Sequence, residues 1–153
     1  MSKNEKKSIT SLKDLRAALD APLTCAFAVD GLPVQLKVRR ITSQIDEQRR
    51  AVVRAVTPPY VRERNDYDML SPQYRAALTV AEDQARSLVV YHCCPEVAAA
   101  NPGLTDTAAI HNHVRGLLPP MIQEMIALTA LAGGLEAEVN AKANFTSTPG
   151  SAS

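Results

Sequence analysis

Apolar and polar residues alternate on both sides of Asp30-Gly31, from Leu23 to Val38. Asp and Gly tolerate the positive φ angles of a two-residue type I′ turn, so this segment predicts a β-hairpin. Such a turn pairs apolar residues throughout: Val29 with Leu32, Phe27 with Val34, Cys25 with Leu36 and Leu23 with Val38. Because a lone hairpin is marginal in water, we expect its apolar face to dock on helices or on another chain.

Two amphipathic helices are predicted on either side of this hairpin. Ser11 is a suitable N-cap for a short helix that groups Leu12, Leu15 and Leu19 before Pro22. The second helix is expected to begin at Thr42 or Ser43, with Ile45, Val52, Val53 and Val56 on one stripe and Arg49, Arg50 and Arg54 in solvent.

The longest helix is predicted to begin at Ser71-Pro72, because Ser is favoured as N-cap and Pro at the first helical position. Pro95 is expected to end it, and the charged segment 60–70 before it to be irregular. Glu82 and Arg86 are expected to pair on its solvent side. Its buried stripe is expected to hold Tyr74, Ala77, Leu78, Ala81, Ala85, Leu88 and Val89.

Two more helices are predicted after the turn at 101–103. Thr105 or Thr107 can cap the first, whose stripe comprises Ile110, His113, Val114 and Leu117. The last helix follows Pro119-Pro120, and Gly133-Gly134 is expected to end it. The pattern as a whole predicts an α+β fold, mainly α, in which an N-terminal β-hairpin packs on a bundle of about five helices.

The chain of 153 residues suits a single domain with its own core. We expect residues 1–9 to form a disordered N-terminal arm, 10–143 a single domain of hairpin and helices, and 144–153 a flexible C-terminal tail. Hydrophobic residues make up 46% of the chain but aromatic ones only 4%, which favours closely packed helices over a β-rich core.

A formal net charge of +1 argues against a generic nucleic-acid or membrane binder. The most apolar run, Leu117–Ala132, is shorter than the roughly 20 residues that span a bilayer. Three cysteines without framework spacing, and no recognisable secretory leader, indicate a reducing cytosol. For the Arg-rich second helix we expect a solvated face, with an acidic protein partner as the next option.

The densest group of reactive side chains is His92-Cys93-Cys94. His111 and His113 are further candidates that the fold could bring close to this group. Zinc sites need about four converging ligands, whereas adjacent cysteines diverge and two histidines two apart lie on different faces of a helix. Thiolates are also disfavoured at a helix C-terminus. We therefore expect a packed, hydrogen-bonded His113, Cys25 as a small hydrophobic residue, and neither a catalytic nor a metal site.

The last predicted helix is apolar over a much wider arc than the ~100° of a half-buried helix. It can be the central helix of a bundle, or part of it can stay open and receive an amphipathic helix of a partner, to which flexible methionines adapt; the two interpretations are compatible. The candidate partner-binding residues are Leu118, Met121, Ile122, Met125, Ile126 and Leu128.

Several segments follow one another in a familiar order: Val38-Arg39-Arg40-Ile41-Thr42, Asn65-Asp66-Tyr67-Asp68, a helix from Tyr74 to Tyr91, Pro102-Gly103-Leu104 and Leu117-Leu118-Pro119. In this order and spacing the chain resembles the tail assembly chaperones of long-tailed bacteriophages, over roughly Leu23 to Ala132.

The resemblance implies a small, mostly helical, non-enzymatic protein that acts in the host cell cytoplasm and is absent from the mature virion. Such chaperones shield the hydrophobic helices of the tape-measure protein and help recruit tail-tube subunits. The resemblance thus implies the tape-measure protein and the tail-tube protein as partners and is compatible with self-association, and no nucleic acid, membrane or cofactor is expected.

Two alternatives stay open. The first is a structural phage protein retained in the virion tail or neck. The second is a thiol- or zinc-dependent enzyme built on His92, Cys93, Cys94 and His113.

Overall fold

The computed structural model describes the backbone of residues 8–146 and the side chains of residues 8–133. Most of the expected N-terminal arm, residues 1–7, and most of the expected C-terminal tail, residues 147–153, therefore lie outside the described residues.

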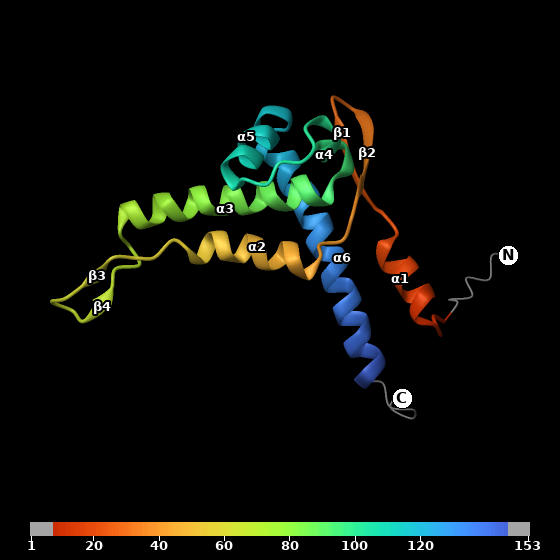
Figure 1. The fold of residues 1–153 in the computed structure, drawn as a ribbon, viewed down its shortest axis with the longest axis horizontal. Coiled ribbons are helices and arrows are strands. Elements are labelled where there is room, and N and C mark those ends of the chain that lie inside the picture. The colour runs from red at the N-terminus through yellow and green to blue at the C-terminus, as the bar shows by residue number, and fades with distance from the viewer. Residues whose placement is uncertain (1–7, 147–153) are drawn as a thin grey trace.

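The described chain is mainly helical and carries an N-terminal antiparallel hairpin, which confirms the predicted fold class (Figure 1). In order, the elements are α1 (Leu12–Asp20), β1 (Leu23–Val29), β2 (Leu32–Val38), α2 (Ser43–Arg54), β3 (Tyr60–Val61), β4 (Asp66–Tyr67), α3 (Pro72–Cys93), α4 (Pro95–Ala100), α5 (Thr107–Leu117) and α6 (Pro120–Thr146). The short helix α4 was not predicted, because Pro95 both ends α3 and occupies the first position of α4.

The hairpin has the predicted register, from Leu23 opposite Val38 to Val29 opposite Leu32. Asp30 and Gly31 adopt φ angles of 52° and 77°, as a type I′ turn requires. Its apolar face packs on α6 at its base, where Cys25 and Val38 are buried. At the tip, Val29 and Leu32 remain exposed.

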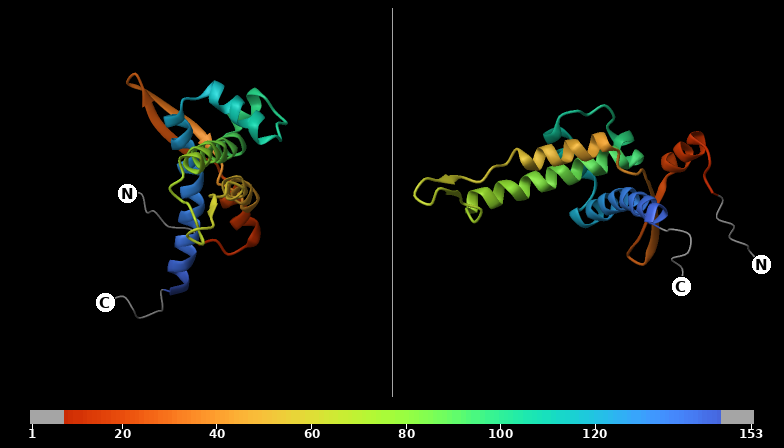
Figure 2. Two further views of the ribbon diagram at one scale, coloured as in Figure 1. Left: turned by 90° about the vertical axis from the view of Figure 1, so that its left-hand side faces the viewer. Right: turned by 90° about the horizontal axis from the view of Figure 1, so that it is seen from below.

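Helices α2 and α3 run antiparallel and side by side, joined by the β3–β4 hairpin at one end (Figures 1 and 2). Helix α5 packs on α3, and α6 crosses α3 to reach the hairpin. The core lies where these elements meet, and its buried residues are Cys25, Val38, Leu88, Val89, Val90, Tyr91, Cys93, Cys94, Val97, Ile110, Val114, Ile126, Ala127 and Ala130.

The segment 60–70 is not irregular as expected, because β3 and β4 pair there. The rings of Tyr60 and Tyr67 meet edge to face with centroids 5.3 Å apart, and Asn65 takes the positive φ of 49° that the turn needs. Strands of two residues are too short to show an alternating pattern, which is why the sequence did not indicate them.

The helix N-caps are mostly those expected. Ser11, Thr42 and Ser71 each accept a hydrogen bond from a backbone N–H three residues ahead. Helix α5 differs, because Asp106 rather than either predicted threonine is its N-cap and accepts from the N–H of Ala109 at 3.0 Å.

Helix α6 does not end at Gly133-Gly134 as predicted but continues to Thr146. Gly133 is buried where α6 meets the hairpin, and a Cβ there would collide with Leu23 Cδ1 and lie 3.1 Å from Arg40 Cγ. This glycine therefore permits close approach instead of ending the helix. The predicted boundary after residue 143 is accordingly wrong for the backbone, since α6 includes 144–146.

Candidate protein-binding surface

One face of α6 is apolar and open to solvent. Met121 is 75% exposed and Leu128 57%, Ala132 is exposed, and Met125 between them is half-buried. These four residues, here called the α6 stripe, follow one another at intervals of four, three and four residues, the spacing of a coiled-coil seam. The stripe thus has the geometry to pack along another helix.

The six predicted partner-binding residues divide between this face and the core. Met121 and Leu128 are exposed, whereas Leu118, Ile122 and Met125 are partly buried against the core. Ile126 is fully buried, so its assignment to a partner-binding surface is wrong. The reason is helical rotation, since five residues separate Ile126 from Met121 and place it about 140° round the axis.

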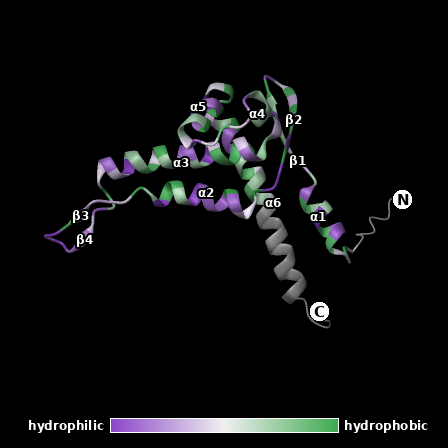
Figure 3. Cartoon of the chain, viewed as in Figure 1, coloured by the Kyte–Doolittle hydropathy of each residue, from purple (hydrophilic) through white to green (hydrophobic). Residues whose placement is uncertain are grey.

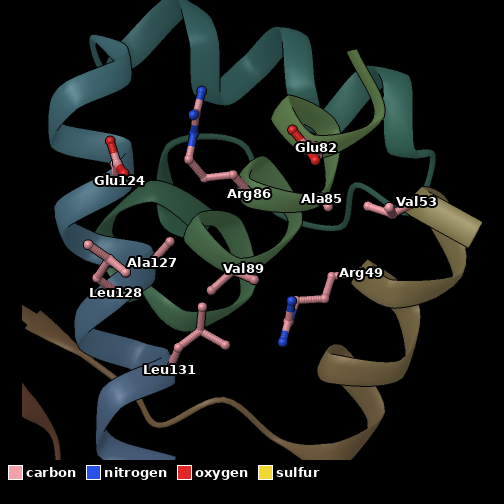
Figure 4. A pocket seen from close by; sticks show the side chains of 10 residues that line it. All are labelled: Arg49, Val53, Glu82, Ala85, Arg86, Val89, Glu124, Ala127, Leu128 and Leu131. Atoms are coloured by element: carbon pink, nitrogen blue, oxygen red, sulfur yellow. The ribbon is translucent and has the colours of Figure 1, made fainter. Parts of the chain in front are cut away.

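A groove of about 260 Å³ opens between α2, α3 and α6 (Figure 4). It is lined by the apolar residues Val53, Ala85, Val89, Ala127, Leu128 and Leu131, and by the charged residues Arg49, Glu82, Arg86 and Glu124. Leu128 belongs both to the α6 stripe and to the groove, so the two form one continuous surface. The sequence did not predict the groove, nor Leu131 as one of its lining residues, because the groove exists only where three helices pack together.

The charged side chains of the groove are partly paired within their own helices. Arg49 Nη2 lies 2.6 Å from Asp46 Oδ1, and Arg86 Nη2 lies 3.3 Å from Asp83 Oδ1. The predicted pairing of Arg86 with Glu82 is therefore wrong, since Asp83 takes that place one turn away. Arg86 Nε is buried and has no hydrogen-bond acceptor within the described part of the chain. The groove thus offers both signs of charge beside an apolar floor.

The exposed basic face of α2 is also neutralised in part by its own helix. Arg50 Nε lies 3.1 Å from Asp46 Oδ2, and Arg54 pairs with Glu47. Such exposed pairs contribute at most about 1 kcal/mol each, but they lower the net positive field of α2. This favours the solvated face expected for α2 over a nucleic-acid-binding one.

The three cysteines lie in the core, His111 and His113 are half-buried beside it, and His92 is exposed. Cys93 and Cys94 are buried, and burial raises the pKa of Cys93 to about 11 and also raises the pKa of Cys94. His113 Nε2 lies 2.8 Å from the carbonyl oxygen of Val97, which confirms the expected packed, hydrogen-bonded histidine. Cys25 is buried on the hairpin face, as a small hydrophobic residue would be.

His111 Nδ1 lies 2.8 Å from the hydroxyl oxygen of the buried Ser87. This contact ties α5 to α3. Among the residues that the structure describes, no three His, Cys, Asp or Glu side chains converge in a way that could hold a metal ion.

Within the described residues, no single helix combines the length and the apolar composition needed to cross a membrane, although α5 and the first part of α6 do so together as a pair bent by 116°.

Comparison of the chain with protein-family models, with curated proteins and with solved structures found no match.

Proposed function

We propose that this protein is a phage tail assembly chaperone whose α6 stripe shields apolar helices of the tape-measure protein. The observation that carries the proposal is the row of solvent-facing apolar side chains at four- and three-residue intervals on α6, continuous with a groove. Singly exposed apolar residues need no explanation, but a contiguous apolar patch marks a binding surface. The order of sequence segments, which resembles that of this family, supports the same assignment.

In the proposed complex, an amphipathic client helix lies along α6 with its own apolar stripe against Met121, Met125 and Leu128. One of its apolar side chains enters the groove beside Leu128. The groove volume of about 260 Å³ accommodates a leucine or a phenylalanine side chain. The flexible methionines adapt to different side chains, which suits a long client of varied sequence. Arg86 and Glu124 at the groove would meet the polar flanks of the client helix.

Recruitment of tail-tube subunits forms part of the same proposal and needs a surface that the client leaves free. The hairpin tip meets this requirement, because Val29 and Leu32 are 44% and 69% exposed. A protein with this role works in the host cytoplasm during assembly.

Mass spectrometry of purified particles distinguishes a chaperone from the alternative, a structural protein retained in the virion tail or neck. A chaperone is missing from the finished particle, whereas a structural protein is recovered in fixed stoichiometry. Recovery of the chain from particles would therefore replace the proposal with this alternative.

The burial of the thiols weighs against the alternative of a thiol- or zinc-dependent enzyme. Nucleophilic cysteines need an accessible thiolate, and the raised pKa of the buried Cys93 keeps its thiol protonated near neutral pH. His113, the candidate partner, is already hydrogen-bonded to Val97.

The proposal is tested by coexpressing the chain with the tape-measure protein of the same phage and measuring the soluble fraction of that client. Met121→Asp combined with Leu128→Asp should reduce it to the level seen without the chaperone, because both side chains are exposed and their loss does not open the core. Val80→Asp is the matched control, since Val80 is 54% exposed on α3 away from the stripe. Equal client solubility with the double variant and the control would refute the proposed binding surface.

A further inference from the structure

Helix α1 presents an apolar face that the described part of its own chain does not bury. Leu12, Leu15 and Leu19 are 73%, 42% and 42% exposed, and α1 has no buried residue. Figure 3 shows hydrophobic and hydrophilic segments alternating along α1. Isolated helices shorter than about 12 residues are marginal in water, and α1 has nine. A nine-residue helix with one leucine stripe therefore needs a surface to cover that stripe.

The C-terminal end of α1 is fixed to the body by Arg40. Its Nη1 donates to the carbonyl oxygens of Ala18, Leu19 and Ala21 at 3.0, 3.3 and 3.4 Å. A cation at this end also interacts favourably with the helix dipole. Because the aliphatic part of Arg40 lies against Gly133, α1 leaves the body at this point of α6.

The groove beside α6 is out of reach of α1 in the same chain. Leu23, which follows α1 closely, packs at Gly133, and Leu128 and Glu124 lie about 140° and 180° round α6 from Gly133. The three Cα–Cα steps from Asp20 to Leu23 span at most about 11 Å, whereas a path of about 140° round α6, at the roughly 8–10 Å that separates the axes of packed helices, is about 20 Å or longer. A straight helix held by Arg40 does not wrap round α6 over this distance.

We propose that α1 docks in the α6 groove of a second copy of this chain, and that the exchange is reciprocal. The leucines of α1 span seven residues, about 10 Å, and Met121 to Leu128 span the same length. The charges also match in number, since α1 carries Lys13, Asp14, Arg16 and Asp20 and the groove Arg49, Glu82, Arg86 and Glu124. Reciprocal docking closes a two-fold dimer in which both apolar surfaces are covered.

The inference concerns the free protein and goes beyond the proposed function without depending on it. If both hold, the arm of a second copy and the client compete for Leu128, so that client binding releases the arm. The dimer then keeps the apolar surface covered until a client is present.

Sedimentation equilibrium of the full chain tests the dimer. The unchanged protein should dimerise, and Leu15→Asp combined with Leu19→Asp should raise its dissociation constant about 100-fold or more, as expected for two leucines that can no longer be buried. Because α1 contributes nothing to the core, this variant should keep its fold. Ala17→Asp, on another face of α1, is the matched control and should still dimerise. A monomeric unchanged protein, or a leucine variant that dimerises like the control, would overturn the inference.

A mixing experiment tests reciprocity. Chains with Leu128→Asp lack the groove contact and chains with the two α1 substitutions lack the arm, so each alone should be monomeric. Mixed, they should form a heterodimer through one intact arm and one intact groove. Absence of that heterodimer, or dimerisation of the Leu128→Asp chains as strong as that of Val80→Asp chains, would contradict docking in this groove.

Client assays separate this inference from the proposed function. The α1 variant should still solubilise the tape-measure protein, and failure of the client assay leaves the dimer measurement unaffected. If the chain is monomeric and the α1 variant instead loses client solubilisation, α1 binds the client and the dimer is overturned.

Discussion

Leu23 of β1 packs directly over the Cα of Gly133 in α6, in the space that a Cβ would occupy. This contact fixes the hairpin to the helix and determines where α1 leaves the body. Nearby, the N–H of Ile41 donates to the carbonyl oxygen of Ala130 at 3.2 Å, so that α6 is joined to the start of β1 by side-chain packing and to the segment after β2 by a backbone hydrogen bond.

Gly133→Ala should destabilise the protein by about 1–3 kcal/mol, because overpacking against Leu23 exceeds the gain in helix propensity. Urea unfolding followed by circular dichroism measures the change. Gly116→Ala in α5 is the control, since an added Cβ there meets nothing within 4 Å, and it should be neutral or stabilise by up to about 1 kcal/mol. Equal effects of the two substitutions would contradict the close approach of Leu23.

Asp106→Ala should cost about 1 kcal/mol of stability through loss of the α5 N-cap. Thr105→Ala removes the hydroxyl that the sequence alone suggested as a cap and should change stability by less than about 0.5 kcal/mol. Chemical denaturation of both variants decides between the two caps, and a larger loss for the threonine variant would refute the assignment to Asp106.

Arg40→Gln should loosen α1 without unfolding the body, because it removes the cation that three carbonyl oxygens of the last turn share. Amide hydrogen exchange in α1, measured on the monomeric variant with both leucine substitutions, should become faster than in the same protein with Arg40 intact. Arg50→Gln, on the exposed face of α2, should leave the exchange of α1 unchanged.

The unfolding free energy should fall as the pH rises from about 9 to about 11, because burial raises the pKa of Cys93 in the folded state from 9.0 to about 11. Burial of the neutral thiol contributes its full stabilisation below the pKa that Cys93 has in the unfolded state. This contribution is lost as the pH rises through the pKa of Cys93 in the folded state. Denaturant unfolding at several pH values under reducing conditions measures this trend. Cys93→Ala should flatten it relative to the unchanged protein, and identical pH profiles would contradict the assignment.

The hairpin could be predicted to the residue, because the Asp30-Gly31 turn and the alternation of apolar residues both specify one register. The N-caps at Ser11 and Ser71 could also be predicted from the sequence, since capping depends on neighbouring residues alone. The end of α6 could not be predicted in this way, because a glycine is typical both of a helix C-terminus and of a close packing contact. Only the position of Leu23 distinguishes the two.

The candidate surface was predictable only in part. An apolar arc wider than a single stripe pointed to α6 as the candidate, and Met121 and Leu128 are exposed there, but the sequence did not separate the buried Ile126 from Leu128. That division depends on where α3 and the hairpin contact α6. The groove has no linear signal, because Val53, Val89 and Leu131 come from three helices whose packing alone brings them together.

The central claim, that the α6 stripe holds an apolar helix of the tape-measure protein, is tested most directly by photo-crosslinking in cells that assemble phage tails. A photoreactive phenylalanine at position 128 should crosslink to the tape-measure protein, while the same residue at position 80 should not, although Leu128 and Val80 are exposed to a similar degree. Crosslinking from position 80 alone, or from neither position while the client is still kept soluble, would contradict the claim.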